Sequence, residues 1–381
     1  MSQTVGTPLG KPGHRLVDAD THINEAPDLW TSRVSSKFKA RVPHMESFDQ
    51  GDAWVMEGVK DPINFGNNVA AGYPPEERQA WVRWDEIRRG GYDPKVRLEE
   101  MDMDLVDAAV LYPTPRISQL VIATEEPEFH LEMVKAYNDW LSEYCAHDPS
   151  RLGGIMLVPN RGVDDAVAEI ERVIGRPGMV GCLIGCFPHG DLNLSEEDDP
   201  VWKTIADADV PLHIHVKLVD EKPTDIYAAG VITEGQAAGD LRFLGVPARM
   251  LQFLNAKVFD RVSTLKIVLA EVDAGWVPYV KEQVDNRLLR RGIGGEVRRQ
   301  VLPSQVIEDH FWYTYITDHF AIRNRHAIGV DRLMWSSDFP HGGSDWPYSL
   351  RVIHADFADV PADERDLILG GNAQSLYKFG I

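Results

Sequence analysis

Short apolar segments alternate with longer stretches along the chain. Eight such segments hold runs of aliphatic and aromatic residues, and their length is typical of buried strands. Two of the stretches between them, 127–146 and 163–175, place apolar residues three and four positions apart, as amphipathic helices do. The apolar segments begin at His14, Asp107, Gly153, Gly178, Val210, Leu265, Phe311 and Arg332.

Eight strands separated by helices predict an α/β fold, a single (β/α)8 TIM barrel, with a doubly wound open sheet as the alternative. No internal repeat or flexible linker is present, so we expect one domain over residues 1–381. Two long segments, 36–95 after the first strand and 217–250 after the fifth, break the simple repeat. Because long loops after barrel strands lie at the catalytic face, we interpret both as lid loops or subunit contacts.

The composition allows a large core and limits the classes of partner. Hydrophobic residues make up 44% of the 381 positions. Lys and Arg number 39 against 59 Asp and Glu, which gives a formal net charge of −20. Since a surface of this charge repels nucleic acids and anionic membranes, we expect neither as a partner. We expect a small-molecule substrate and assembly into a homo- or hetero-oligomer.

The amino-terminal residues MSQTVGTPLGKPG lack the basic and apolar regions of a secretory signal. No apolar run approaches the roughly 18 residues of a membrane helix, so we expect a soluble, cytoplasmic protein. The three cysteines, Cys145, Cys182 and Cys186, do not have zinc-finger spacing, which fits a reducing compartment. We expect Cys182 and Cys186 to be core residues beside the end of an apolar strand.

Three ionisable residues, Asp18, Asp20 and His22, occupy alternate positions of the first predicted strand. Residues two apart on a strand point to the same face, so these side chains should converge. A buried charge requires an opposite charge, hydrogen bonds or a metal ion. Asp18 lies deeper in the strand, and we expect it to be structural.

Acids and histidines also stand at the ends of later strands. The fifth strand carries His213 and His215, and Glu271 follows the sixth. Asp338 and then His341 follow the eighth. In a barrel these carboxyl ends meet at one face, and imidazole and carboxylate groups are ligands of divalent zinc, manganese and iron.

Taken alone, each of these residues could have a structural role, such as a hydrogen bond in the core or a cap. Their joint occurrence at the ends of several strands is what indicates a site. His215 is nearer the strand end than His213, so we assign the site position to His215 and a supporting position to His213. Three residues in loops after strands are weaker candidates for substrate contact: His189, Asp345 and Trp346.

The motifs that carry these residues resemble the amidohydrolase superfamily. The similarity is to the amidohydrolase-related group that includes aminocarboxymuconate semialdehyde decarboxylase and the resorcylate-type decarboxylases, and it runs from about His14 to Phe379. It rests on the order of VDADTHINEAPDLW, RLEEMDMDLVDAAVLYPT, AYNDWLSEYCAHDPSRLGGIMLVP, VPLHIHV, LKIVLAEVDAGWVPYV, LMWSSDFPH and GNAQSLY.

The resemblance implies a divalent metal ion at the mouth of the barrel, held by Asp20, His22, His215 and Asp338. The commonest family pattern at the first strand is His-x-His, and this chain has Asp20 in place of the first histidine. Related decarboxylases also carry an acid there. Two carboxylates with two histidines form a harder ligand set, which favours manganese or iron without excluding zinc.

A second departure concerns Glu271, which stands where aminocarboxymuconate semialdehyde decarboxylase has a catalytic histidine after the sixth strand. The acid–base role of that histidine therefore does not transfer unchanged. Glu271 remains a candidate general base, a candidate ligand of a second metal ion, or a partner of another side chain.

We expect a metal-dependent hydrolase or non-oxidative decarboxylase acting on a small carboxylic acid or amide, because a bound divalent ion serves either reaction. In hydrolysis, Asp338 or Glu271 would take the proton of the attacking water. In decarboxylation, His341 or Asp338 would deliver a proton to carbon. The alternatives are a dinuclear iron or manganese monooxygenase of the same superfamily, and a non-catalytic metal-binding partner subunit.

Overall fold

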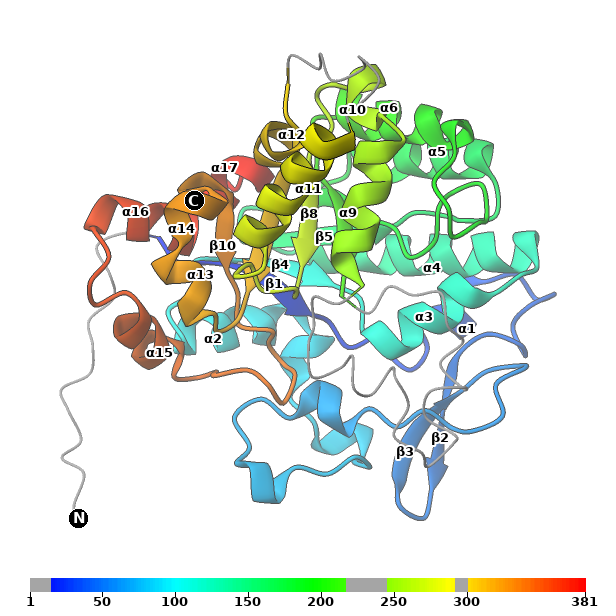
Figure 1. The fold of residues 1–381 in the computed structure, drawn as a ribbon. Coiled ribbons are helices and arrows are strands. Elements are labelled where there is room, and N and C mark those ends of the chain that lie inside the picture. Colours follow the sequence, from blue (N-terminus) through cyan, green and yellow to red (C-terminus); the bar gives the residue numbers. More distant parts are fainter. Residues whose placement is uncertain (1–14, 217–244, 292–300) are drawn as a thin grey trace, which may run out of the picture.

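The fold is an eight-stranded parallel barrel surrounded by helices (Figure 1). The computed structural model describes residues 15–216, 245–291 and 301–381. Its strands pair in chain order, and each matches a predicted apolar segment, so the (β/α)8 prediction is confirmed. They are β1 (Val17–His22), β4 (Ala108–Tyr112), β5 (Leu152–Leu157), β6 (Met179–Leu183), β7 (Leu212–His215), β8 (Ile267–Ala270), β9 (Phe311–Tyr315) and β10 (Leu333–Trp335).

Backbone hydrogen bonds join the segment after β10 to β1. The Asp338 N–H donates to the Asp20 carbonyl oxygen at 3.0 Å, and the His22 N–H donates to the Phe339 carbonyl oxygen at 2.7 Å. The Ser337 N–H also donates to Asp18 Oδ1 at 2.9 Å. These bonds bring the residues after the last strand against the end of the first strand.

The helical stretches 127–146 and 163–175 form α4 (Pro127–Cys145) and α5 (Val163–Val173), as predicted. Proline at the start of α4 suits a helix because its missing N–H would have no partner there. The other α-helices of the described residues are α1 (Leu29–Arg33), α2 (Pro94–Met103), α3 (Pro115–Ala123), α6 (Asp199–Asp207), α9 (Val246–Asn255), α10 (Val258–Arg261), α11 (Val277–Arg291), α12 (Pro303–His310), α13 (His319–Arg323), α14 (Arg325–Ile328), α15 (Ser349–Asp356), α16 (Ala362–Asp366) and α17 (Asn372–Tyr377).

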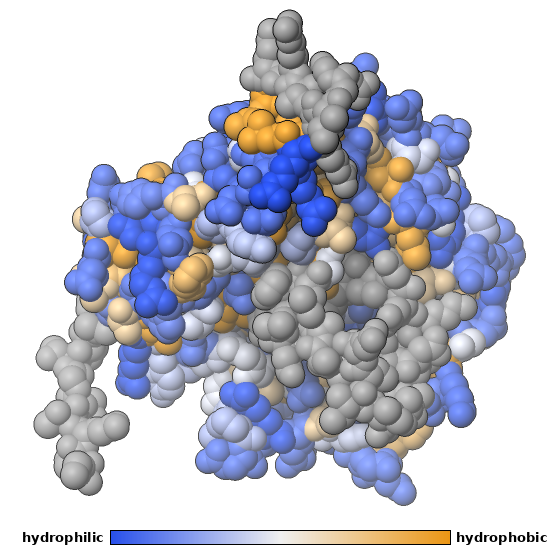
Figure 2. Space-filling model, in the orientation of Figure 1, coloured by the Kyte–Doolittle hydropathy of each residue, from blue (hydrophilic) through white to orange (hydrophobic). Residues whose placement is uncertain are grey.

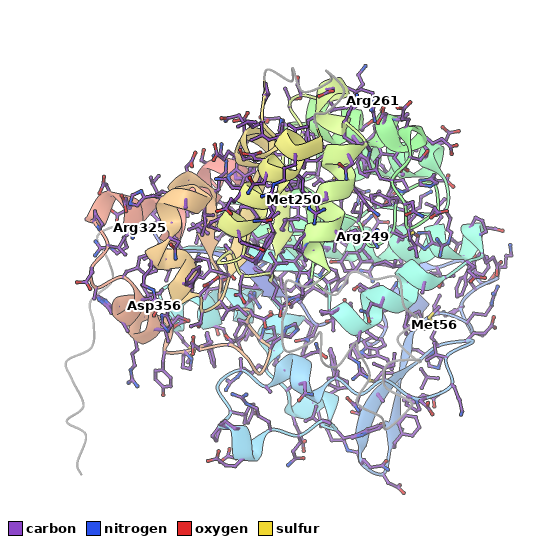
Figure 3. All side chains as sticks on the ribbon, in the orientation of Figure 1. Met56, Arg249, Met250, Arg261, Arg325 and Asp356 are labelled. Carbon is purple, nitrogen blue, oxygen red and sulfur yellow. The ribbon has the colours of Figure 1, made fainter. Side chains whose placement is uncertain are left out.

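Helix α9 illustrates how the outer layer meets the barrel (Figure 3). Met250 is fully buried, whereas its neighbour Arg249 donates to the carbonyl oxygen of Leu192 at 2.7 Å. The buried residues of α9, Val246, Met250 and Phe253, are three and four positions apart, so they form one apolar face against the core.

The long segment 36–95 has secondary structure of its own. It contains the antiparallel hairpin β2 (His44–Phe48) and β3 (Gly51–Val55), seen below the barrel in Figure 1. Asn67 and Ala71 of this segment are hydrogen-bonded through the backbone to Gly342 and Pro340 of the loop after β10. Most of the second long segment, 217–250, lies outside the described residues. The role of both segments as lids or subunit contacts stays a prediction.

The face of the molecule in Figure 2 is mostly hydrophilic, with smaller hydrophobic areas, as the composition suggests. Among the described helices, none has both the length and the apolar character to cross a bilayer. Cys182 is buried as expected, whereas Cys186 is only partly buried and packs against the edge of the core. Cys186 lies in the loop beyond the end of β6, and its thiol donates to the carbonyl oxygen of Asp191 in the same loop at 3.0 Å.

Candidate metal centre

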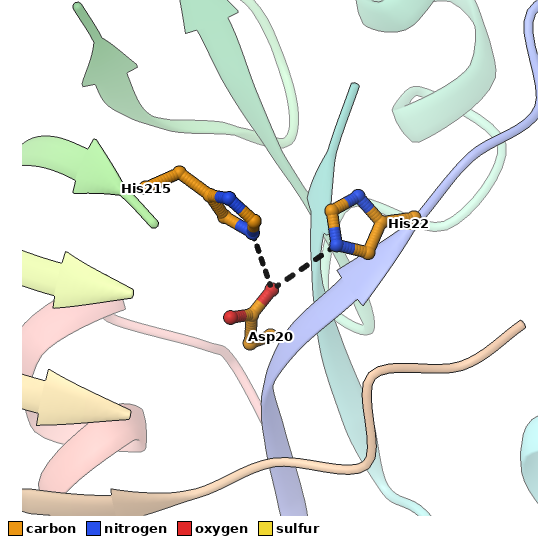
Figure 4. Close-up of side chains that lie close together, drawn as sticks. All are labelled: Asp20, His22 and His215. Carbon is orange, nitrogen blue, oxygen red and sulfur yellow. Dashed lines mark ion pairs between the residues drawn. The ribbon is translucent and has the colours of Figure 1, made fainter. Parts of the chain in front are cut away.

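The carboxyl ends of β1 and β7 bring Asp20, His22 and His215 together (Figure 4). Asp20 Oδ1 lies 3.7 Å from Nε2 of His22 and 3.7 Å from Nε2 of His215. All three side chains are buried. Their nitrogen and oxygen atoms lie within 4.8 Å of one another, so a single cation could contact all of them.

Asp338 and His341 complete the group from the loop after β10. Asp338 Oδ1 lies 3.3 Å from His22 Nε2 and 2.7 Å from His341 Nδ1. The rings of His22 and His341 are stacked, with their centroids 4.1 Å apart. Glu271, directly after β8, places Oε2 at 3.4 Å from His215 Nε2. The structure therefore brings together all six residues selected from the sequence: Asp20, His22, His215, Glu271, Asp338 and His341.

The ring of His22 is oriented by the backbone. Its Nδ1 lies 2.8 Å from the carbonyl oxygen of Pro113, which can only accept, so Nδ1 carries a proton. Nε2 then points at the carboxylates of Asp20 and Asp338. His22 Nε2 is buried, with Asp338 Oδ1 at 3.3 Å and Asp20 Oδ1 at 3.7 Å. A lone pair facing carboxylate oxygens is unfavourable unless a proton or a cation lies between them, so these residues fit a metal ion.

The charged side chains of this group shift one another's pKa values. Burial alone would lower the pKa of His22, but Asp338, and further Asp20 and Glu271, raise the pKa to about 9. Burial opposes ionisation of Asp338, yet His341 and His22 hold the pKa of that carboxyl well below its usual range. Asp338 is therefore ionised at neutral pH, and a bound cation would compete with the proton on His22.

Two acids of the site have left-handed backbone conformations. Glu271 and Asp338 both have φ of +57°, which is unfavourable for residues with a side chain. Such strain is found where the surrounding structure holds the residue in place. For Asp338, the bond from its N–H to Asp20 is one such restraint.

The supporting residues predicted on the strands lie behind the group. Asp18 accepts from the Ser337 N–H at 2.9 Å, and burial raises the pKa of Asp18 to about 7. His213 Nδ1 lies 2.6 Å from the hydroxyl of Tyr112, and burial lowers the pKa of His213 to about 3. The structural role of Asp18 and the supporting role of His213 stay predictions.

The three weaker loop candidates have other partners. His189 Nδ1 lies 2.9 Å from the carboxylate of Asp198, which also accepts the His189 backbone N–H, so this pair holds the loop after β6. Trp346 is buried and donates its indole N–H to the carbonyl oxygen of Glu100 at 3.0 Å, which makes it a packing anchor. Asp345 accepts the N–H of Tyr348 with its carbonyl oxygen, within the same loop.

Sequence reasoning missed three residues that support the site. Asn68 in the first long segment places Nδ2 3.1 Å from His341 Nε2. Arg97 on α2 is buried and donates to the carbonyl oxygen of His22 at 3.1 Å. Thr314 on β9 donates to Asp20. Arg97 belongs to the RLEEMD motif, which was a usable signal, whereas no pattern distinguishes Asn68 or Thr314 from ordinary loop and strand residues.

Known proteins resemble this chain in sequence and in fold. The model of the amidohydrolase family matches residues 17–379. The chain belongs to the amidohydrolase family. A curated relative, the γ-resorcylate decarboxylase of Polaromonas sp. (strain JS666 / ATCC BAA-500), is 25% identical over 331 residues, which cover 81% of this chain and 93% of the relative.

Solved structures of other proteins share the fold of this chain. An amidohydrolase from Mycobacterium avium subsp. paratuberculosis K-10 has a TM-score of 0.73 at 22% identity, covering 96% of this chain and 99% of that one. A dihydroxybenzoic acid decarboxylase from Polaromonas sp. JS666, solved with bound manganese and the inhibitor 2-nitroresorcinol, has a TM-score of 0.63 at 21% identity, covering 97% and 98%.

These comparisons confirm the resemblance drawn from the motifs. They also confirm the predicted class, a metal-dependent hydrolase or non-oxidative decarboxylase of the amidohydrolase family. The relatives favour neither the monooxygenase nor the non-catalytic subunit. The roles of the individual site residues stay predictions.

Proposed function

We propose that this amidohydrolase is a non-oxidative decarboxylase of small hydroxylated aromatic carboxylic acids. The observation that carries the proposal is the orientation of His22, whose Nδ1 is held by Pro113 so that Nε2 faces the carboxylates of Asp20 and Asp338. A relative of 25% identity is a γ-resorcylate decarboxylase, which supports this class of substrate.

We assign Asp20, His22, His215 and Asp338 as the residues that hold a divalent ion. Two carboxylates and two imidazoles favour manganese, with iron and zinc as alternatives. When bound, such an ion would supply positive charge and Lewis acidity toward the oxygens of an acidic substrate. Glu271, at 3.4 Å from His215, is next to this set and serves either in proton transfer or as a ligand of a second ion.

His341 and Asp338 are the candidates for proton delivery. Their Nδ1 and Oδ1 atoms lie 2.7 Å apart, so the pair can hold one proton beside the place where a substrate would bind. In the reaction, this proton adds to the ring carbon that bears the carboxylate. The bond between that carbon and the carboxylate then breaks, and its electron pair stays on the ring as carbon dioxide leaves. No oxidant or reductant is required.

The test uses the full chain loaded with manganese and a panel of hydroxybenzoates that includes γ-resorcylate. We expect release of carbon dioxide together with the decarboxylated phenol, at the same rate with and without oxygen.

Other outcomes would contradict the proposal. Turnover that requires oxygen would show that the protein is a monooxygenase and not a decarboxylase. Hydrolysis of amides without loss of carbon dioxide from any acid would place the protein among the hydrolases. A chain that binds metal but turns over no substrate would be a partner subunit. The predicted oligomer is checked on the same preparation by light scattering.

A further inference from the structure

The hydroxyl group of Thr314 links two elements of the candidate metal centre. Thr314 lies on β9 and is fully buried. Its Oγ1 accepts the backbone N–H of Glu271 at 2.7 Å and lies 3.1 Å from Asp20 Oδ2. The N–H of Glu271 can only donate, so the hydroxyl proton is available for the carboxylate, which can only accept. The direction of both hydrogen bonds is therefore determined.

The bond to Asp20 distinguishes the two oxygens of that carboxylate. Oδ2 is held by Thr314, whereas Oδ1 is the atom that lies 3.7 Å from both imidazole nitrogens. Rotation of the carboxylate would break the bond to the buried hydroxyl. The restraint therefore keeps Oδ1 directed at the position that a cation would take between His22 and His215.

The second bond acts on Glu271. This residue has φ of +57°, a conformation that requires restraint from its surroundings. Thr314 Oγ1 accepts the N–H of Glu271 and so anchors the backbone at this residue. The side chain of Glu271 then places Oε2 3.4 Å from His215 Nε2. One hydroxyl group thus orients two of the acids in the candidate centre.

We propose that Thr314 is a positioning residue that selects Oδ1 of Asp20 as the metal ligand and sets the position of Glu271. This inference rests on the metal site of the proposed function. A purely structural role would be to satisfy a buried N–H. That role predicts a loss of stability without a specific loss of metal affinity.

Thr314→Val keeps the shape of the side chain and removes the hydroxyl group. The protein is stripped with a chelator, and manganese binding is followed through the electron paramagnetic resonance signal of the free ion. We expect the dissociation constant to rise about 10–100-fold, the usual effect of losing a residue that orients a ligand. Thr314→Ser retains the hydroxyl and should stay close to wild type. Thr124→Val, which removes a hydroxyl bonded to the Leu120 carbonyl oxygen, should not change binding.

The outcomes separate the two proposals. If wild type binds manganese and Thr314→Val binds it equally well, the positioning role is wrong and the metal site stands. Equal losses in Thr314→Ser and Thr314→Val would also overturn the role of the hydroxyl. If wild type binds no manganese, iron or zinc, both proposals fail. Should Thr314→Val not fold, Thr314→Ala is compared with Thr314→Ser in the same assay.

Discussion

Asn68 Nδ2 lies 3.1 Å from Nε2 of His341, so the long segment after β1 reaches into the candidate site. An amide NH₂ group donates, so Nε2 of His341 accepts and the proton on the ring resides on Nδ1, next to Asp338. Asn24 also contacts Asn68, with its Nδ2 3.5 Å from the Asn68 backbone carbonyl oxygen. The segment thereby helps to orient the residue that we propose as proton donor.

We predict that Asn68→Ala lowers kcat about tenfold, the effect of losing one hydrogen bond that orients a reacting group. Metal content should not change, because Asn68 contacts His341 rather than the four proposed ligands. The rate and the metal content are measured on one preparation. Asn67→Ala is the matched control, because the Asn67 side chain is exposed and its backbone bond to Gly342 is kept. A normal rate in Asn68→Ala would remove this residue from the site.

His215→Ala should lower metal content and abolish activity while most of the fold is kept. His215 is one of the two imidazoles within 3.7 Å of Asp20 Oδ1, and alanine offers no ligand atom. Elemental analysis measures the metal, and circular dichroism checks the fold. His189→Ala, which removes a histidine bonded to Asp198, is the control. Full metal occupancy in His215→Ala would show that His215 is not a ligand.

Glu271→Gln separates the roles that remain open for Glu271. The amide keeps the size of the side chain and removes its charge. If Glu271 acts in proton transfer, the variant should retain its metal and lose about 10²–10⁴-fold in rate. If Glu271 binds a second ion, the metal stoichiometry should fall as well. Unchanged rate and unchanged metal content would leave Glu271 a structural residue.

His130 should make the protein sensitive to acid. Its Nδ1 donates to the Val121 carbonyl oxygen at 2.8 Å, and its Nε2 accepts the Asn160 N–H at 3.0 Å, so the buried ring is held neutral. Burial lowers the pKa of His130 from 6.5 to about 4. The unfolded chain therefore binds more protons between these values, and the free energy of unfolding should fall as pH drops from about 6.5 to about 4.

The size of this effect is on the order of 3 kcal/mol, from 1.4 kcal/mol for each pKa unit. Urea unfolding at several pH values measures it. His130→Gln lacks the titrating group and should show a flatter dependence in this window, although it is less stable at pH 7. His147→Gln, at an exposed histidine, should follow wild type. Parallel curves for wild type and His130→Gln would contradict the prediction.

The sequence by itself determined the eight strands that alternate with helices and the strand ends that carry the candidate ligands. Apolar runs and helical patterns are local, so the strands and helices α4 and α5 could be recognised without knowing their neighbours. Asp20 and His22 were recognisable for the same reason, because alternate residues of one strand share a face. Helix α2 was harder to recognise, since its buried face includes the charged residues Arg97 and Glu100.

Only the tertiary structure decided which side chains orient those ligands. Thr314 and Asp20 are 294 positions apart, and Asn68 and His341 are 273 apart. A buried threonine in a strand or an asparagine in a loop has no distinguishing local pattern, since β-branched residues favour strands and asparagine favours turns anyway. Their contacts arise from barrel closure, which brings β9 beside β8 and the residues after β10 against β1. Hydrogen bonds act over about 3 Å, so two side chains interact only where the folded barrel places them that close. No local sequence pattern contains this distance.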